Sequence, residues 1–276
     1  MKKTSIEDDI LQTGLLLNEK YSPKYNKVYY STNEDLNALL EVFDVKDKSI
    51  LSVVGSGDQA FHFYSKNAKN IDLFDINKIT IHYYYLRVWI IKYLGDYYPN
   101  KDFASYIEYL LEMVKPITKQ ENESLLYWEK FIRYFPKNSI IKLFKHKSLT
   151  DEKTHSMDMD ILDKRLSAGN PVFYNIDISE KINKKIDTKY DVIYVSNIRD
   201  WIIGKSNLWH FYCENLYNLL NDNGVVLSSN VISNGPWGEE IGSFEKNFDY
   251  KILSGNATHS ILEFESPGYI YTKKKQ

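Results

Sequence analysis

The sequence predicts an α/β fold, in which a mostly parallel sheet carries helices, ends in an antiparallel strand and contains a helical insertion. Short apolar runs alternate with helical patterns, and the first run, residues 50–54, has no polar interruption except Ser52, as expected for a strand covered on both faces. This run leads into Gly-Ser-Gly at 55–57, and the run at 71–74 leads into Asp75. A glycine turn followed by an acid at the next strand end is typical of a site for a nucleotide-type ligand.

The N-terminal part, residues 1–48, is predicted to form a helical and aromatic cap. Apolar residues at roughly helical spacing predict a helix within 1–20. A second helix is predicted over 34–43, where Asn33 or Thr32 can cap it and acids stand in its first turn.

The sheet domain is predicted to comprise 49–94 and 171–276. In its first half, a crossover helix follows the glycine turn at 58–66, and Asn77 caps a long helix over 78–94 whose apolar residues form a buried stripe.

Residues 95–170 interrupt this alternation, and we expect them to form a helical insertion that serves as a lid or substrate region. Three prolines separate the helical patterns, and none of the segments has strand character. The expected helices are 102–114, 121–134, 138–146 and 157–167.

The second half of the sheet follows the insertion. The last strands have no helix between them, so we expect an antiparallel end to the sheet. The expected strands are 171–177, 190–197, 224–229, 250–253, 259–264 and 269–272, with helices at 208–220 and 239–246.

Composition excludes several classes of function. A formal net charge of −2 gives no basic field for nucleic acid, and the single cysteine, Cys213, cannot form an internal disulfide. The start of the chain lacks the apolar run of a signal peptide, and charged residues interrupt the most apolar window, 79–94. We expect a cytoplasmic protein, and no metal site is predicted.

The glycine turn fits two kinds of ligand. Residues 55–60 match the loose pattern G-x-G-x-x-G/A, so a nicotinamide dehydrogenase is one alternative. A pyrophosphate binds free amides at a helix N-terminus, and the Asp58 carboxylate would repel it there by about 1 kcal/mol or more at an effective dielectric near 20. S-adenosylmethionine (SAM) has no phosphate but has an ammonium and a sulfonium, and an acid in this loop suits it.

Three features together resemble the class I SAM-dependent transferases. They are the acid Asp75 after the second strand, the acid Asp177 after the third, and the terminal antiparallel strand. The resemblance implies a Rossmann-like class I SAM-dependent methyltransferase fold with SAM as cofactor. Asp75 would then bind the ribose, and Asp177 would face the adenine amino group.

A narrower resemblance is to the bacterial diacylglycerol 3-amino-3-carboxypropyl transferases, which make the head group of betaine lipids. It rests on Tyr-Ser-Thr-Asn-Glu-Asp at 30–35, Tyr-Trp at 127–128 and Ser-Asn-Ile-Arg-Asp-Trp at 196–201. The chain departs from the family at Asn33, where an aromatic is favoured, and in the glycine loop. The resemblance implies transfer of an aminocarboxypropyl group to a small molecule or lipid head.

The candidate site residues follow from these patterns. Asn197, Asp200 and Glu34 are the candidate catalytic residues, although an acid at a helix start or turn is also a common cap. The expected cofactor-binding residues are Tyr30, Gly55, Ser56, Gly57, Asp58, Gln59, Asp75, Ile76, Asn77, Asp177, Ile178 and Asn197.

Alternatives remain open at this point. Aminocarboxypropyl transfer is placed narrowly ahead of methyl transfer, and a non-catalytic SAM-binding protein is the alternative outside enzymes. Residues 130–147 contain six basic residues, no acid and several apolar residues, a composition that suits either contact with an anionic membrane surface or an ordinary packed helix. The sequence does not predict the acceptor or the oligomeric state.

Overall fold

The structure is a computed structural model. It describes residues 5–20, 27–29, 32, 34–95, 103–144, 157–169, 171–182, 186–198, 202, 206–229, 246–253, 257–258, 263–264 and 268–274.

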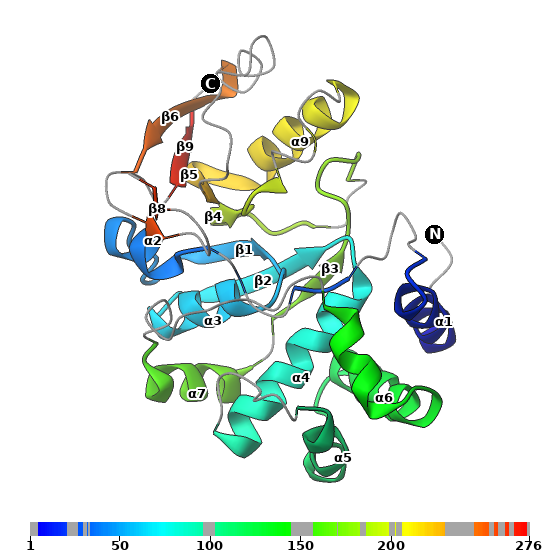
Figure 1. Ribbon diagram of the computed structural model, residues 1–276. Coiled ribbons are helices and arrows are strands. Elements are labelled where there is room, and N and C mark those ends of the chain that lie inside the picture. The colour runs from blue at the N-terminus through cyan, green and yellow to red at the C-terminus, as the bar shows by residue number, and fades with distance from the viewer. Residues whose placement is uncertain are drawn as a thin grey trace.

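A seven-stranded sheet forms the middle of the molecule, in the order β3-β2-β1-β4-β5-β9-β6 (Figure 1). Strands β3, β2, β1, β4 and β5 pair in parallel, whereas β9 pairs antiparallel with both β5 and β6. This arrangement confirms the expected parallel sheet with an antiparallel end. The strands are β1 (Ser49–Val53), β2 (Asn70–Asp75), β3 (Phe173–Asn175), β4 (Tyr190–Tyr194), β5 (Leu220–Ser229), β6 (Phe248–Ile252) and β9 (Gly268–Lys273).

Helices lie on both faces of the sheet. Helices α3 (Asp58–Ser65), α4 (Lys78–Leu94) and α7 (Met159–Ala168) lie on one side, and α9 (Ser206–Leu219) lies on the other (Figure 1). Successive residues of a strand point to opposite faces, so one strand contributes to two cores. Ile50 of β1 belongs to the core that includes α3 and α4, whereas Leu51 joins the core that includes α9.

The other helices pack outside the first of these layers. Helices α1 (Ile6–Leu17) and α5 (Phe103–Met113) pack against α6 (Lys119–Tyr134), which packs against α4, and the short helix α2 (Leu36–Val42) contacts α3. Reciprocal capping boxes fix the starts of α1, at Ser5 and Asp8, and of α6, at Thr118 and Glu121. Asn77 caps α4 as expected, and the helix ends at Gly95 in a left-handed conformation.

Several local expectations need correction. Asp35 caps α2, because its side chain accepts from the Ala38 amide. Thr32 does not cap it, and Asn33, the other expected cap, lies outside the described residues. The segment expected as a helix over 138–146 is a 3₁₀ helix, η1 (Lys137–Leu143), and β5 begins at Leu220, before the glycine expected to start it.

Residues 239–245 of the predicted helix 239–246 and most of the predicted strand 259–264 lie outside the described residues. Two short paired strands, β7 (Ala257–Thr258) and β8 (Glu263–Phe264), are described in that part of the chain. The division of the chain into cap, sheet domain and insertion remains a prediction.

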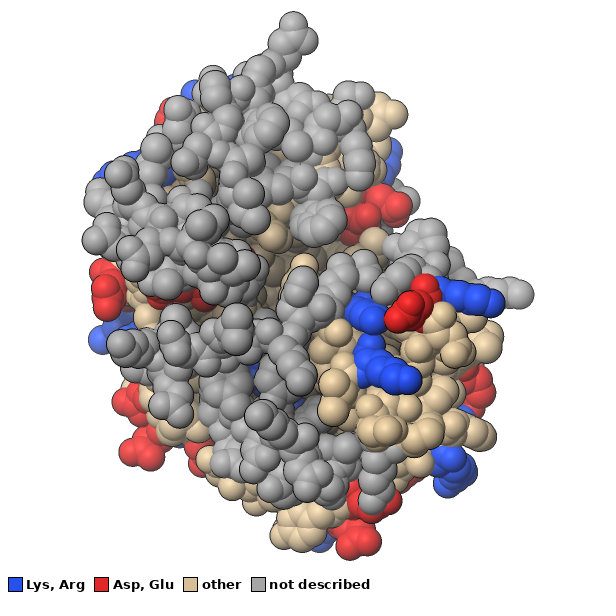
Figure 2. Space-filling view, in the orientation of Figure 1, with Lys and Arg blue, Asp and Glu red and all other residues tan. Residues whose placement is uncertain are grey.

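Two surface properties complete the fold. On the face shown in Figure 2, the described Lys and Arg side chains lie beside Asp and Glu side chains rather than in one basic patch. No helix within the described ranges is long and apolar enough to cross a membrane.

Candidate functional site

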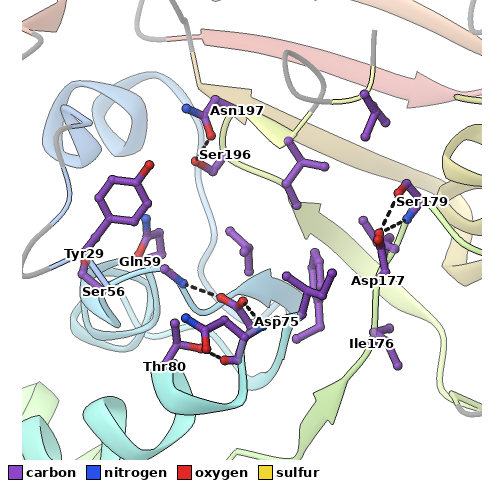
Figure 3. A pocket seen from close by; sticks show the side chains of 18 of the residues that line it. Tyr29, Ser56, Gln59, Asp75, Thr80, Ile176, Asp177, Ser179, Ser196 and Asn197 are labelled. Atoms are coloured by element: carbon purple, nitrogen blue, oxygen red, sulfur yellow. Dashed lines mark hydrogen bonds between the residues drawn. The ribbon is translucent and has the colours of Figure 1, made fainter. Parts of the chain in front are cut away.

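A cavity of about 460 Å³ opens where the chain leaves the carboxyl ends of β1, β2, β3 and β4 (Figure 3). The strand order reverses between β1 and β4, and ligands of open α/β sheets bind at such a switch point. The described lining residues are Lys27, Tyr29, Thr32, Glu34, Val53, Gly55, Ser56, Gln59, Phe74, Asp75, Ile76, Asn77, Thr80, Ile176, Asp177, Ile178, Ser179, Ser196, Asn197, Ile198, Ile202 and Leu208.

The glycine turn between β1 and α3 forms part of the cavity wall. Gly55 (φ +53°) and Gly57 (φ +91°) both adopt the left-handed conformation that residues with a side chain rarely take. A Cβ at Gly57 would also lie 3.2 Å from the Tyr84 ring. The Gly55 amide donates to Asp75 Oδ2 (3.3 Å), and the Gly57 amide donates to the Val54 carbonyl (2.7 Å). Two amides of this turn are therefore already engaged within the protein.

Asp58 does not line the cavity, which corrects the expectation that its carboxylate faces the ligand. It is fully buried and pairs with the equally buried Arg87 of α4, whose Nη1 lies 2.7 Å from Asp58 Oδ1. Its other oxygen accepts from the Thr32 amide (2.6 Å) and from Ser56 Oγ (2.6 Å). Arg87 neutralises Asp58, so the Asp58 carboxylate would not repel a phosphate in the way expected from the sequence.

Glu34 supplies the buried negative charge instead. Its residue is 8% exposed and lines the cavity, and both carboxylate oxygens accept hydrogen bonds from neutral donors. Burial, together with the Glu34 charge, holds the pKa of Tyr194 well above its usual value, so the phenol remains a donor. The donors are Tyr194 Oη (2.6 Å), Gln59 Nε2 (3.1 Å), Thr32 Oγ1 (3.3 Å), Ser229 Oγ (2.6 Å) and Ser196 Oγ. None of these partners carries a positive charge, so the carboxylate can attract a cation in the cavity.

Gln59 lies beside this carboxylate. Because its Nε2 donates to Glu34, its Oε1 is left as an acceptor, and this buried oxygen has no hydrogen-bond partner among the described residues. Buried acceptors are rarely left unpaired in proteins. Glu34 and Gln59 together therefore combine a buried negative charge, whose oxygens already accept from the protein, with one acceptor that the described residues leave unfilled, Gln59 Oε1.

Asp75 stands at the end of β2, near the middle of the cavity (Figure 3). The Asn77 amide donates to its Oδ1 (2.8 Å), and the Gly55 amide to its Oδ2. Burial raises the pKa of Asp75 to about 6, although these backbone donors act in the opposite direction. The carboxylate is thus placed to accept from a pair of ligand hydroxyls while it is ionised.

Asp177 follows β3, on the side of Asp75 opposite Gln59 (Figure 3). Its Oδ1 accepts from the Ser179 amide (2.9 Å) and hydroxyl (2.6 Å), and no described residue donates to its Oδ2. Ile76, Ile178 and other apolar side chains line the same cavity. This part combines apolar walls with one carboxylate oxygen, which suits a flat ring that carries an amino group.

Ser196 and Asn197 follow β4. Ser196 takes a left-handed backbone conformation (φ +51°), and its carbonyl accepts from Ser228 Oγ (2.9 Å) and the Ser229 amide (3.2 Å). Such conformations in residues other than glycine occur often at functional sites. The turn directs Ser196 Oγ to Glu34 and places Asn197 in the cavity wall.

The structure brings most predicted site residues together. Those that line the cavity are Glu34, Gly55, Ser56, Gln59, Asp75, Ile76, Asn77, Asp177, Ile178 and Asn197. Gly57 and Asp58 do not line it, because they support the turn from behind, and Tyr30 and Asp200 lie outside the described residues.

Sequence reasoning missed other residues of the site. Lys27, Tyr29 and Thr32 reach the cavity from the N-terminal segment, and Ser179 reaches it from the turn after β3. Arg87 could have been found, because a lone arginine within an apolar helix needs a buried counterion. No pattern in the sequence indicates Lys27 or Tyr29.

Comparisons with known proteins give only distant similarity. No protein-family model and no curated protein matches the chain. The structure of the glycopeptide N-methyltransferase MtfA complexed with S-adenosyl-L-homocysteine is 8% identical, with a TM-score of 0.46 and coverage of 98% of each chain. The N-methyltransferase NodS from Bradyrhizobium japonicum WM9, in complex with the same compound, is 7% identical, with a TM-score of 0.41 over 96% of this chain and 100% of NodS.

A third similar structure is a TehB-like SAM-dependent methyltransferase from Corynebacterium glutamicum ATCC 13032 Kitasato, 10% identical, with a TM-score of 0.41 and coverage of 98% of each chain. TM-scores below 0.5 decide neither activity nor substrate. We infer activity and substrate from the side chains that line the cavity.

Proposed function

We propose that the protein is a SAM-dependent transferase and, within that class, a methyltransferase. The observation that carries the proposal is the buried Glu34 carboxylate, which lines the cavity and whose hydrogen-bond donors among the described residues are all neutral. A buried anion is stabilised by a cation within a few ångströms. SAM has an ammonium, a sulfonium and one carboxylate, so its net charge is positive, and it has no phosphate.

The cavity residues fit the parts of SAM in order along the sheet. Glu34 and Gln59 would hold the ammonium, Asp75 and Asn77 the ribose hydroxyls, and Asp177 the adenine amino group. Gln59 and Asp177 lie on either side of Asp75, as an extended ligand of this kind requires (Figure 3).

A nicotinamide dinucleotide fits less well. Its pyrophosphate needs free amides at the glycine turn, but the Gly55 and Gly57 amides already have acceptors. The described lining also contains three carboxylates, Glu34, Asp75 and Asp177, against one amino group, Lys27. A ligand with two phosphates would meet an excess of negative charge.

When bound, SAM supplies an electrophilic carbon next to a sulfonium. The protein's own residues then have to orient the two reactants and exclude water. Asn197 is the residue we place nearest the acceptor, because it lines the cavity on the turn after β4. The roles expected of Asp200 and Tyr30 remain predictions.

The burial of the proposed ammonium site favours methyl transfer, which reverses the order expected from the sequence. Thr32, Glu34 and Gln59 are each at most 8% exposed, so a methionine chain held by them would be covered along its length. The methyl group is then the carbon left for an acceptor. Aminocarboxypropyl transfer is the second candidate, because Ser196 and Asn197, part of the sequence that resembles that family, line the cavity.

The acceptor is proposed to be a small molecule or a lipid head. Contact with a membrane through 130–147 has less apolar surface to use than the composition suggested, because Ile140 and Leu143 are buried in the core. Of these three apolar residues only Ile141, at 52% exposed, has side-chain surface that could contact a membrane.

Incubation with SAM and cell extract, followed by mass analysis of the nucleoside product, tests the proposal. S-adenosylhomocysteine is the expected product. Methylthioadenosine would instead support aminocarboxypropyl transfer. Binding of SAM without either product, over a range of extracts, would support the non-catalytic alternative.

A further inference from the structure

The ion pair between Arg87 and Asp58 lies behind the cavity wall, and neither residue lines the cavity. Both side chains are fully buried, and Arg87 comes from the middle of α4. Arg87 Nη1 also donates to the Ser56 carbonyl (3.1 Å), and its guanidinium lies over the Phe61 ring at 5.0 Å. The pair therefore ties α4 to the glycine turn.

Asp58 also ties the N-terminal segment to the same turn. Its Oδ2 accepts from the Thr32 amide (2.6 Å) across 26 positions of the chain. Thr32 Oγ1 in turn accepts from the Glu34 amide (3.2 Å) and from Gln59 Nε2 (3.4 Å). A continuous set of hydrogen bonds thus leads from Arg87 to the Glu34 carboxylate.

Stability alone does not explain a buried ion pair at this place. An apolar pair of similar volume would avoid the desolvation of both charges and is often as stable or more stable. The pair does offer a fixed geometry, because the carboxylate accepts from three groups on three different segments: Thr32, Ser56 and Arg87.

We propose that Arg87 and Asp58 are positioning residues for Glu34. Asp58, held by Arg87, fixes the segment at Thr32 and thereby places the Glu34 carboxylate where it receives the ammonium of the cofactor. This inference rests on the proposed function, but it adds a determinant of cofactor affinity outside the cavity.

Asp58→Asn tests the proposal. In this variant the side-chain oxygen can face Arg87 while the amide group faces the Thr32 N–H, so Thr32 loses its acceptor. Calorimetry should show SAM affinity reduced about tenfold, because displacement by about 1 Å is enough to weaken an oriented contact. Affinity for methylthioadenosine, which lacks the ammonium, should stay within about twofold. An equal loss for both ligands would contradict the proposal, because it would indicate general damage to the cavity.

A double-mutant cycle with Glu34→Gln gives the sharper result. If Asp58 acts through Glu34, the variant with both changes binds SAM no more weakly than Glu34→Gln alone, within about twofold. If the losses of SAM affinity caused by the two single changes multiply in the double variant, the proposal is wrong. Asp72→Asn is the matched control, because Asp72 is an acid of β2 that accepts a hydrogen bond from Tyr190 and does not line the cavity. This variant should keep SAM affinity within about twofold of wild type.

Folding and function are separated by two further measurements. The variant Asp58→Asn with Arg87→Met leaves no unpaired buried charge, and it should show the same selective loss of SAM affinity if Asp58→Asn alone does not fold. The wild-type protein is titrated first. Failure of wild type to bind SAM would remove the proposed function and this inference together, whereas SAM binding with multiplying losses would remove the inference alone.

Discussion

Glu34→Gln removes one negative charge from the cavity and keeps the shape of the side chain. A hydrogen bond to a charged group contributes about 1.5–3 kcal/mol. At 4 Å and an effective dielectric near 20, the attraction between unit charges is about 4 kcal/mol. Because Glu34 is only 8% exposed, screening by water is limited, and we expect a loss of about 3 kcal/mol, or about 100-fold in SAM affinity.

Calorimetry with two ligands checks this expectation. Methylthioadenosine has the adenosine part but lacks the aminocarboxypropyl group, and its sulfur is neutral. Because it carries no cation for Glu34 to attract, its affinity for Glu34→Gln should stay close to that for wild type. The partners of Glu34 include four hydroxyl groups, from Thr32, Tyr194, Ser196 and Ser229, which can rotate to suit a glutamine, so the free energy of unfolding should change by less than about 1 kcal/mol. Glu41→Gln, at an exposed position of α2, is the control. Unchanged SAM affinity in Glu34→Gln would remove Glu34 from the cation site and refute the reasoning.

Three further predictions concern the residues around this carboxylate. Because the pKa of Asp75 is raised to about 6, SAM affinity should fall as pH decreases through 6, since the ribose hydroxyls lose an ionised acceptor. The unliganded protein should instead become more stable as pH falls through the same range, because the folded state binds the proton more tightly than the unfolded state. Calorimetry and urea unfolding from pH 5 to 8 should show both trends, and Asp75→Asn should abolish them. Arg87→Met should lower the free energy of unfolding by about 3–5 kcal/mol, because it leaves the Asp58 carboxylate buried without its counterion. Adding Asp58→Asn to this variant should recover most of the loss. If urea unfolding shows that the two losses add instead, the ion pair is not as described. Gly57→Ala should be more destabilising than Gly95→Ala. Both glycines have a positive φ, which costs a residue with a side chain about 1–2 kcal/mol, but only the Cβ at Gly57 would meet ring atoms, at 3.2 and 3.3 Å. Equal melting temperatures for the two variants would count against the described packing.

Much of the fold could be predicted because its signals are local. The run at 50–54 and the glycines after it specify a buried strand and a turn within a few residues, and the caps at Asn77 and Gly95 mark the ends of α4 in the same way. The 3₁₀ form of η1 was not predictable, since α and 3₁₀ helices of this length have similar patterns. The cap of α2 was misplaced by two or three positions, because Thr32, Asn33 and Asp35 are all residue types found at N-caps.

In the site, too, the residues that local signals indicate could be predicted, and those that depend on distant partners could not. Asp75 and Asp177 could be predicted to line the cavity, because an acid at the carboxyl end of a parallel strand necessarily stands at that edge of the sheet. The role of Asp58 could not, because it depends on Arg87, 29 positions later and on another element. Likewise, two donors to Glu34, Tyr194 and Ser229, come from β4 and β5, and only the folded chain brings them to the N-terminal segment.

Calorimetric titration of the wild-type protein with SAM, and separately with NAD⁺, tests the central claim most directly. The acids of the cavity and the engaged amides of the glycine turn predict one SAM bound per chain and no measurable binding of NAD⁺. Binding of NAD⁺ without binding of SAM would contradict the account, because it would require a pyrophosphate among Glu34, Asp75 and Asp177.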